Sequence, residues 1–386
     1  MKPPDITDAK RMFLSAPHMS GREIAYVQQA FDSNYIAPVG PQLNQFEESF
    51  REITGFKHCV AVSSGTAGLH LALLGLGIKA GDIVLGSTLT FIGSVASVKY
   101  CNAELVFVDS DRHSWNMSPD LLAEEIERLT AAGKKPAAVL PTELYGQPCD
   151  LDRIREVCDP HEIPVICDAA ESLGATYRGL PTGRKAKVAI SSFNGNKIIT
   201  TSGGGMIASD DENLINQCRY LATQARQPVL HYEHNDVGFN YRMSNVVAAI
   251  GIGQLEVLAE RVNQKRQIAA WYAKRFDQVD GIELMPEVDF GRSTRWLTVA
   301  TVDPNKLSTR PLEIIAALES HNIESRPVWK PLHLQKAFAD CRCVGGEIST
   351  DLYENGICLP SGTIMGKSDV DRVCDIVLDA LKYRGQ

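Results

Sequence analysis

Short apolar runs alternate with helix-length segments through the first two-thirds of the chain, and this alternation restricts the possible folds more than any other feature. The apolar runs predict strands at 58–62, 82–86, 104–109, 137–141, 163–168, 188–193 and 205–209. Helical patterns such as 121–133 and 151–159 separate most of them. Near-continuous apolar strands joined by helices are typical of an α/β fold with a mostly parallel sheet and helices on both faces. Ligands bind such sheets beyond the carboxyl ends of the strands.

From about residue 212 the pattern changes to longer helices. Residues 244–279 predict one long helix that connects two domains. The remainder predicts a smaller α+β domain, with a strand at 296–302 and helices at 311–321 and 368–383. Because 386 residues exceed what one small core can organise, we expect two domains. These are an N-terminal arm with a large cofactor-binding domain at 1–250, and the connecting helix with a small C-terminal domain at 251–386.

The composition is ordinary for a globular protein, and it argues against several kinds of partner. The formal net charge is −8 and no dense Lys/Arg run occurs, so we expect no nucleic-acid partner. No apolar segment is long enough for a membrane span, and residues 1–13 lack the apolar core of a signal peptide. Ten cysteines without an export signal predict reduced thiols and a cytoplasmic protein. Cys341 and Cys343 form a CxC pair without a second cluster at zinc spacing, so we expect no metal.

Residues 63–77 follow a predicted strand and begin a predicted helix. Their first residues bring hydroxyl groups and unpaired backbone N–H groups to the helix N-terminus, which suits a phosphate: Ser63, Ser64, Gly65 and Thr66. An ordinary Ser/Thr helix cap would have the same pattern. The chain has no GxxxxGK followed by Ser or Thr, and no GxGxxG follows the first strand, so neither a P-loop nor a dinucleotide-binding turn is indicated.

Two further side chains follow predicted strands. Asp168 ends the run IPVICD, where a carboxylate is costly to desolvate unless a cation meets it. A protonated pyridine nitrogen would be such a cation, and a helix N-cap is the alternative role. Phe91, in STLTFIGS, could lie against the face of a flat ring or could belong to the core.

Lys197 stands shortly before three consecutive glycines in SSFNGNKIITTSGGGM. A surface lysine next to a glycine turn would look the same. One loop and one strand after Asp168, however, can bring Lys197 to the same rim of the sheet, where a desolvated amine can attack an aldehyde and form a Schiff base. A phosphate cradle, a pyridinium partner, a ring-stacking aromatic residue and a Schiff-base lysine match the requirements of pyridoxal 5′-phosphate. We therefore expect this cofactor.

Seven stretches spread over nearly the whole chain carry a resemblance to one enzyme family. They are SNYIAPVGPQLNQFEESF, SSGTAGLHLAL, STLTFIGS, CDAAESLGA, SSFNGNKIITTSGGGM, ATQARQPVLHYEHNDVGFNYRMSNVVAAIG and PLHLQ. The chain resembles the DegT/DnrJ/EryC1/StrS family of sugar aminotransferases, which have the aspartate-aminotransferase fold (fold type I). NGNKIITTSGGGM and HYEHNDVGFNYRMSN are most similar to enzymes that aminate a UDP-linked 4-keto-6-deoxy-N-acetylhexosamine on the route to bacillosamine.

The resemblance implies a role for each matching cofactor position. Lys197 matches the Schiff-base lysine, Asp168 the partner of the pyridinium nitrogen, and Phe91 the ring-stacking residue. The positions that match phosphate ligands are Gly65, Thr66, Ala67 and Ser192. Asn240, in GFNYR, matches a residue that the family delivers across a dimer interface to the neighbour's phosphate. The resemblance therefore implies a homodimer whose active sites are shared between the subunits.

Other matching positions concern the substrate and the cofactor ring. The positions near the sugar nucleotide are Asn34, Tyr35, Ile36 and Ala37, and those in the segment that closes over the substrate are Arg326 and His333. Glu171 falls where other members often have Gln or His, near the phenolic oxygen of the cofactor. An ionised carboxylate beside a phenolate is repulsive, so either Glu171 or the phenol should hold a proton. The sequence does not locate that proton.

The resemblance implies an amino transfer in two stages. L-Glutamate first converts the cofactor to pyridoxamine phosphate, which then aminates C4 of a keto sugar such as UDP-2-acetamido-2,6-dideoxy-hexos-4-ulose. Lys197 would act both as nucleophile and as acid/base catalyst. One alternative is an aminotransferase for a GDP- or dTDP-linked sugar, a cyclitol or an amino acid. Others are a pyridoxamine-phosphate-dependent 3-dehydratase, which carries His in place of the lysine, and a non-enzymatic regulator on the same scaffold.

Overall fold

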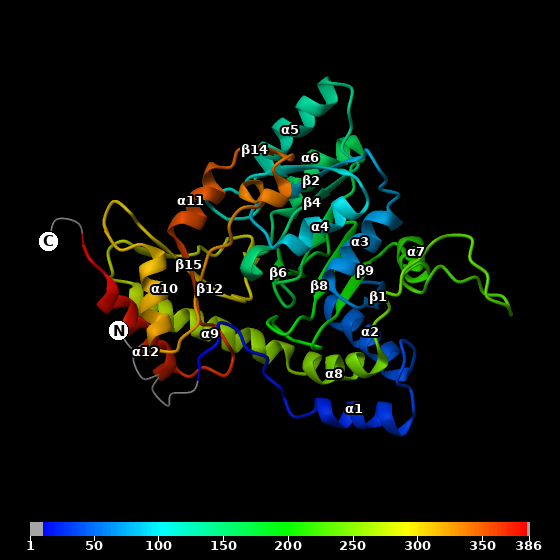
Figure 1. The fold of residues 1–386 in the computed structure, drawn as a ribbon, viewed down its shortest axis with the longest axis horizontal. Helices are drawn as coiled ribbons and strands as arrows, with labels where there is room; N and C mark the ends of the chain where they lie inside the picture. Colours follow the sequence, from blue (N-terminus) through cyan, green and yellow to red (C-terminus); the bar gives the residue numbers. More distant parts are fainter. Residues whose placement is uncertain (1–10, 384–386) are drawn as a thin grey trace.

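The computed structural model describes residues 11–383, and its centre is a layer of strands between two layers of helices (Figure 1). The layer consists of two four-stranded sheets with orders β1-β9-β8-β5 and β14-β3-β2-β4. Parallel bridges from Val139 to Val165 and from Thr142 to Asp168 join the two sheets along β4 and β5. The strands are β1 (His58–Val62), β2 (Ile83–Ser87), β3 (Glu104–Val108), β4 (Ala138–Leu140), β5 (Ile166–Asp168), β8 (Val188–Ser192), β9 (Gly205–Ser209) and β14 (Arg342–Val344).

The strand directions in the central layer are mostly parallel. β2 pairs in parallel with β3 and β4, β14 with β3, and β5 with β8. β9 runs antiparallel to both of its neighbours, β1 and β8. β8 and β9 are joined by a loop without a helix, which suits antiparallel neighbours, because a parallel pair needs a longer crossover. The predicted fold class is confirmed.

Alternate residues of the buried strands supply two hydrophobic cores, one on each face of the layer. In β8, Val188 and Ile190 belong to one core and Ala189 to the other. The helices of the first core are α3 (Gly65–Gly75), α4 (Ile92–Tyr100) and α7 (Glu212–Ala222). Those of the second are α2 (Pro41–Thr54), α5 (Pro119–Ala131), α6 (Leu151–Cys158) and α8 (Asn245–Leu255). Burial on both faces explains why the strands are almost entirely apolar.

Several helices begin and end at local signals in the sequence. Ser118 Oγ accepts a hydrogen bond from the Leu121 N–H at the start of α5, where Pro119 occupies the first turn. Asp150 caps α6 in the same way by accepting from the Arg153 N–H. α2 ends at Gly55, whose φ of 73° is easy for glycine and uncommon for other residues.

The C-terminal part forms an antiparallel sheet of order β10-β12-β15-β13. Its strands are β10 (Ile282–Leu284), β12 (Thr298–Val302), β13 (Arg326–Pro327) and β15 (Gly356–Leu359). A third core lies between this sheet and the helices α9 (Leu258–Phe276), α10 (Pro311–Ser320) and α12 (Lys367–Ala380). The predicted strand at 296–302 and helices at 311–321 and 368–383 are confirmed, with slightly different ends.

Short elements complete the described part of the chain. They are α1 (Glu23–Asp32), α11 (Glu347–Asn355), β6 (Thr176–Tyr177), β7 (Leu180–Pro181), β11 (Gly291–Arg292), and the 3-10 helices η1 (Leu144–Gly146), η2 (Asp159–His161), η3 (Leu332–Leu334) and η4 (Lys336–Phe338). All ten cysteines are free, and eight of them are buried. No helix within residues 11–383 combines the length and apolarity needed to cross a membrane.

The prediction of a single helix at 244–279 is wrong, because the chain forms two helices, α8 and α9, that are separated at Glu256 and Val257. Val257 has φ −110° and ψ 7°, outside helical geometry. Neither glycine nor proline marks the break. Glu256 instead accepts hydrogen bonds from Arg22, the residue before α1, and from Tyr26 of α1, so a tertiary contact that periodicity does not reveal accompanies the break.

One strand of the C-terminal part belongs to the central layer. β14 pairs in parallel with β3, with Arg342 opposite Val106 and Val344 opposite Val108. In Figure 1, β14 lies at the central layer of strands although its colour marks it as a late segment of the chain. The two-domain division at residue 250 stays a prediction, and the pairing of β14 with β3 brings a segment from beyond that point into the central layer.

Candidate active site

A cavity of about 240 Å³ lies at the carboxyl ends of β5 and β8, where an α/β sheet is expected to bind ligands. Asp168 and Ser192 end these strands, and the N-terminal ends of α3 and α4 complete the wall. The lining residues are Ser64, Gly65, Thr66, Leu69, Phe91, Gly93, Ser94, Asp168, Ala170, Glu171, Ser192, Asn194, Asn196, Lys197, Gly203, Gly204, Trp296 and Trp329. The cavity adjoins a chamber of about 770 Å³ through the shared residues Phe91, Asn196, Trp296 and Trp329.

Lys197 lines this cavity from the loop between β8 and β9. Its Nζ lies 3.3 Å from Glu171 Oε1 and 4.2 Å from the centre of the Trp296 ring. The other carboxylate oxygen of Glu171 accepts a hydrogen bond of 2.7 Å from the Tyr145 N–H. The amine is thus held between an acidic group and an aromatic face, with 12% of the lysine side chain exposed.

Glu171 gains or loses its proton near neutral pH. Burial raises the pKa of this carboxyl group to about 7, although Lys197 and the Tyr145 N–H lower it. Asp168, a second buried carboxylate, raises it further. A group that exchanges a proton in this pH range therefore lies in direct contact with the Lys197 amine.

Asp168 is a buried carboxylate that makes two hydrogen bonds. Ser94 Oγ donates to its Oδ2, and the Ala170 N–H donates to its Oδ1 at 3.0 Å. Burial raises the pKa of Asp168, and Ser94, the Ala170 N–H and the Lys197 charge lower it. No ion pair reaches this carboxylate from the residues that the structure describes. A cation in the cavity, such as a protonated ring nitrogen, would offset its desolvation.

The N-terminus of α3 offers backbone donors to the cavity. Ser64 Oγ accepts a hydrogen bond of 3.0 Å from the Ala67 N–H, so the predicted serine cap is present. Gly65 and Thr66 begin the helix, and their N–H groups therefore have no intrahelical partner. A Cβ at Gly65 would lie 3.1 Å from Ser192 Cβ, so glycine leaves room at this wall. These donors, the Asp168 carboxylate and the Lys197 amine fit the phosphate, the ring nitrogen and the aldehyde of pyridoxal phosphate.

The three glycines after Lys197 have different surroundings. A Cβ at Gly205 would lie 2.6 Å from the carbonyl carbon of Ser64, and a Cβ at Gly204 would lie 2.5 Å from Thr201 Oγ1. A Cβ at Gly203 would meet nothing within 4 Å, and this residue lines the cavity. The glycine run lets the backbone pass close to the start of α3 and keeps the cavity open, which explains why it follows the lysine.

Two more of the predicted positions, Phe91 and Arg326, line the cavity or the chamber. Phe91 precedes α4 and is 58% exposed, which excludes the core role, and its ring centre lies 5.8 Å from that of Trp329. Arg326 lines the larger chamber and pairs with Glu324 at 2.7 Å. Both residues are open to a ligand that fills the two spaces.

Other predicted positions lie outside the cavity wall of a single chain. Residues 34–37 follow α1, and the carbonyl groups of Tyr35 and Ala37 accept hydrogen bonds from Asn245. Asn240 is exposed and its side-chain oxygen accepts from Gln224 at 3.1 Å. His333 bonds to Thr88 Oγ1 at 2.7 Å and lines a surface hollow beside Gly346.

Sequence reasoning missed several residues of the site. Trp296 and Trp329 come from the C-terminal part and form one wall, and no motif marks either of them. Ser94 lies one turn into α4, where it looks like a helix residue without a special role. Tyr145 has φ 52°, an uncommon conformation for tyrosine, and its N–H binds Glu171. These contacts depend on the tertiary fold, so local patterns could not reveal them.

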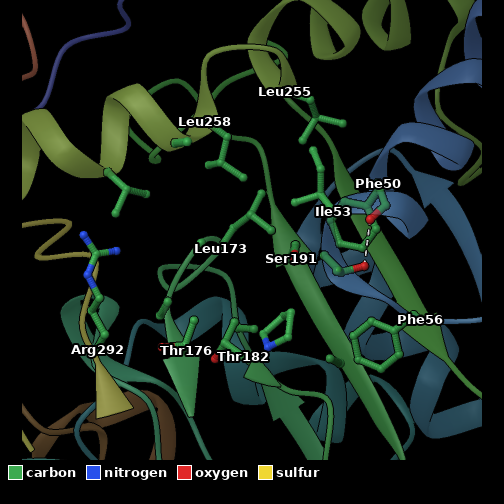
Figure 2. Close-up of a pocket in the computed structure, with 18 of the residues that line it drawn as sticks. Phe50, Ile53, Phe56, Leu173, Thr176, Thr182, Ser191, Leu255, Leu258 and Arg292 are labelled. Carbon is green, nitrogen blue, oxygen red and sulfur yellow. Dashed lines mark hydrogen bonds between the residues drawn. The ribbon is translucent and has the colours of Figure 1, made fainter. Parts of the chain in front are cut away.

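A separate cavity of about 520 Å³ lies on the other face of β8 (Figure 2). Ser191 lines it, whereas the next residue, Ser192, lines the first cavity, as the alternation of side chains along a strand requires. Phe50, Leu255 and Leu258 contribute to its mainly apolar wall, as Figure 2 shows. Its lining contains no lysine, histidine or cysteine. The candidate chemistry therefore belongs to the first cavity.

Comparison with known proteins gives matches along nearly the whole chain. The sequence profile of the DegT/DnrJ/EryC1/StrS aminotransferase family matches residues 17–378. EpsN of Bacillus subtilis (strain 168), assigned by name as a pyridoxal phosphate-dependent aminotransferase, is 48% identical over 96% of this chain and 95% of its own length. The GDP-perosamine synthase of Caulobacter vibrioides is 38% identical over 95% of this chain and 98% of its own length.

A solved structure shares the whole fold. The PLP form of Spr1654 from Streptococcus pneumoniae, assigned as a sugar aminotransferase, has a TM-score of 0.88 and 25% identity, over 97% of this chain and 100% of that one. The family profile covers the strands, the lysine loop and most of the C-terminal part. The chain therefore belongs to the DegT/DnrJ/EryC1/StrS aminotransferase family.

Proposed function

We propose that this aminotransferase moves an amino group from L-glutamate to C4 of a nucleotide-linked 4-keto-6-deoxy sugar, and that the sugar is UDP-2-acetamido-2,6-dideoxy-hexos-4-ulose. The observation that carries the proposal is the contact of Lys197 with Glu171 at 3.3 Å, in a cavity that also contains the buried Asp168. This is the arrangement of a reactive amine beside a proton-exchanging acid and an anion for a cationic ring.

The cofactor is pyridoxal phosphate, which supplies an aldehyde that an amine can attack and a protonated ring that withdraws electrons from the reacting carbon. Asp168 would bind the ring nitrogen, and Phe91 would cover one face of the ring. The phosphate would bind at the N-terminus of α3 and the end of β8, through Gly65, Thr66, Ala67 and Ser192. The Ala67 N–H already donates to Ser64 Oγ, so Gly65 and Thr66 are the stronger backbone donors.

Lys197 is the nucleophile and the proton carrier in this proposal. Once its amine is free, it takes a proton from Cα of glutamate and later delivers one to C4 of the sugar. Glu171 binds the amine when it is charged and can exchange a proton with it, because the pKa of this carboxyl group is about 7. The Trp296 ring, 4.2 Å from the amine, keeps water away from one side of it.

The larger chamber is the proposed binding space for the acceptor. Arg326 and Lys330 line it and can neutralise a diphosphate, while Phe13 and Tyr353 offer aromatic faces to a base. The choice of a 4-keto-6-deoxy-N-acetylhexosamine as the sugar rests on the resemblance of the NGNKIITTSGGGM stretch to enzymes that aminate it. A GDP-linked hexose is the second candidate, because GDP-perosamine synthases of Caulobacter vibrioides and Escherichia coli O157:H7 are 38% and 35% identical to this chain.

A cytoplasmic homodimer completes the proposal. Asn240 and residues 34–37 lie outside the cavity of their own chain, so they would serve the cavity of the partner. The loop before Asn240 supports such an interface, because Leu230, Tyr232 and Val237 are 100%, 79% and 91% exposed. Burial of these apolar side chains against a second copy would remove them from water.

The test is the visible absorption spectrum of the purified protein with pyridoxal phosphate. A band from the bound cofactor should fade with L-glutamate and return when the UDP-linked keto sugar is added. A band that fades with glutamate and returns with a GDP-linked 4-keto sugar alone would favour the second candidate. A band that ignores glutamate would overturn the donor assignment.

A further inference from the structure

Lys265, on α9, is a buried lysine outside the proposed active site. It is 2% exposed, and its ammonium group donates three hydrogen bonds, to Ser15 Oγ at 3.1 Å, the Trp296 carbonyl at 2.9 Å and the Ser361 carbonyl at 2.9 Å. These acceptors come from the N-terminal segment, the approach to β12 and the end of β15. All three protons of the ammonium group are therefore used, and three distant segments meet at one atom.

Lys265 has no carboxylate partner in the described part of the chain, residues 11–383. Burial lowers its pKa to about 7, and no charged neighbour contributes to the shift. Burying a cationic group without an opposite charge is costly, and methionine of similar length would avoid that cost. Methionine would, however, leave the buried Trp296 and Ser361 carbonyl groups without this donor, so only the lysine links the three segments.

Ser15 and Trp296, which accept hydrogen bonds from Lys265, also bind the carbonyl of Asn196, the residue before Lys197. Ser15 Oγ donates to the Asn196 carbonyl at 2.9 Å, and the Trp296 indole N–H donates to the same oxygen at 2.7 Å. The ring of Trp296 also faces the Lys197 amine at 4.2 Å. The ammonium group of Lys265 thus binds both Ser15 and Trp296. These two residues bind the Asn196 carbonyl, and the Trp296 ring also contacts the Lys197 amine.

The geometry points to Lys265 as a positioning residue for the amino transfer: by binding Ser15 and the Trp296 carbonyl, it holds the Asn196 carbonyl and the Trp296 ring so that the Lys197 amine meets the reacting carbon. This inference rests on the proposed role of Lys197. Small displacements of a reacting group can lower the rate about a hundredfold, so a distant positioning residue can affect the rate as much as a residue in direct contact.

The experiment compares Lys265→Met with a matched variant, Tyr272→Phe, in the full-length protein. Tyr272 lies on the same helix and its hydroxyl donates to the Pro360 carbonyl at 3.0 Å, next to Ser361, but it does not bind Ser15, Asn196 or Trp296. Two quantities are measured. One is the kcat and KM of the glutamate half-reaction, and the other is the rate at which formaldehyde and cyanoborohydride methylate Lys197 in the cofactor-free protein, followed by mass spectrometry.

We expect Lys265→Met to lower kcat about tenfold with little change in KM, and to change the methylation rate of Lys197, because Lys265 acts on position and not on binding. Tyr272→Phe should leave both quantities near wild type. Wild-type kcat and methylation in Lys265→Met would overturn the inference, and so would equal losses in the two variants, which would indicate general loosening.

A second variant keeps the inference testable if Lys265→Met does not fold. Ser15→Ala removes one of the two bonds to the Asn196 carbonyl and leaves the ammonium group in place. It should lower kcat in the same direction by a smaller factor, and an unchanged kcat would count against the positioning role. If Lys197→Ala itself keeps turnover, the proposed function fails; if Lys197→Ala is inactive while the Lys265 variant is normal, the positioning role alone fails.

Discussion

The Glu171 carboxylate lies 3.3 Å from the Lys197 amine while its other oxygen is bound by the Tyr145 N–H at 2.7 Å. One oxygen thus faces the reacting group and the other fixes the side chain to the backbone of a neighbouring segment. This division lets Glu171 change its charge without losing its position.

Glu171→Gln should retain cofactor binding and change the pH profile of the glutamate half-reaction. The carboxyl pKa of about 7 means that the wild-type group loses its proton as the pH rises through neutrality. We therefore expect a limb near pH 7 in the wild-type rate profile that is absent in the variant. Stopped-flow rates between pH 5.5 and 9, together with the cofactor Kd, check this, and identical profiles would contradict it.

Glu143→Gln is the matched control for Glu171. Glu143 is also fully buried with a pKa of about 7, but it accepts hydrogen bonds from Ser172 and Thr182 and not from Lys197. In the folded protein the pKa of each glutamate is about 7, above its ordinary value of 4.5, so the folded state binds the proton more tightly than the unfolded chain. The free energy of unfolding should therefore fall as the pH rises from about 4.5 to 7. Both substitutions should flatten that decline in denaturant titrations, and Glu171→Gln alone should alter the rate profile.

Lys197→Ala should abolish turnover and leave a folded protein that still binds pyridoxamine phosphate. Loss of both the nucleophile and the acid/base group should lower kcat by at least about a thousandfold. Lys187→Ala is the control, because that lysine pairs with Asp211 at the surface and is far from the cavity lining. Turnover comparable to wild type in Lys197→Ala would remove the central assignment.

Ser94→Ala should weaken cofactor binding about tenfold, because the buried Asp168 carboxylate loses a hydrogen-bond donor and holds a proton more readily. A protonated Asp168 is a poorer partner for a cationic ring nitrogen. Ser97→Ala, one turn further along the same helix, removes a buried hydroxyl that donates to the Ser94 carbonyl at 3.3 Å and should change the Kd little. Equal affinities for wild type and Ser94→Ala by fluorescence titration would argue against the pairing.

Lys265 should make folding stability depend on pH in the alkaline range. Its folded pKa is about 7 and its ordinary value 10.5, so between these limits the unfolded chain binds the extra proton and stability rises with pH. Lys265→Met should lack this rise. The comparison uses the free energy of unfolding from urea titrations between pH 7 and 9.5, and parallel curves for the two proteins would show that Lys265 stays charged.

Mixed dimers test whether the active sites are shared. Lys197→Ala and Asn240→Ala homodimers should each be impaired. The first lacks the lysine in both of its sites, and the second lacks the asparagine that each subunit would supply to the partner's site. Random exchange of the two chains should restore about a quarter of wild-type activity, since half of the dimers then contain one intact site out of two. No recovery after subunit exchange, checked by native mass spectrometry, would contradict the role of Asn240.

The strands and several of the residues that line the cavity were predictable because their signals are local. A strand buried on both faces is apolar in nearly every residue, as in β1 and β9, and Asp168 and Lys197 stand at the ends of such runs or in the loops that follow them. The sequence marks both Lys197 and Glu171, but it does not predict their contact, because only the tertiary fold brings the two side chains together.

Features that depend on distant parts of the chain escaped prediction. The break at Val257 coincides with a contact of Glu256 with α1, and Trp296 reaches the cavity from the C-terminal part. Lys265 looks like an ordinary polar residue of an amphipathic helix, and its burial follows from segments that lie at both ends of the sequence. No pattern within one window of the sequence contains such information.

The pairing of β14 with β3 has a consequence for the order of synthesis. Until residues 342–344 leave the ribosome, β3 presents an unpaired edge to its surroundings. An apolar strand with free backbone groups is a template for association with other chains. A chain that ends before β14 would therefore be prone to aggregate even if it contained every residue that lines the cavity at the carboxyl ends of β5 and β8.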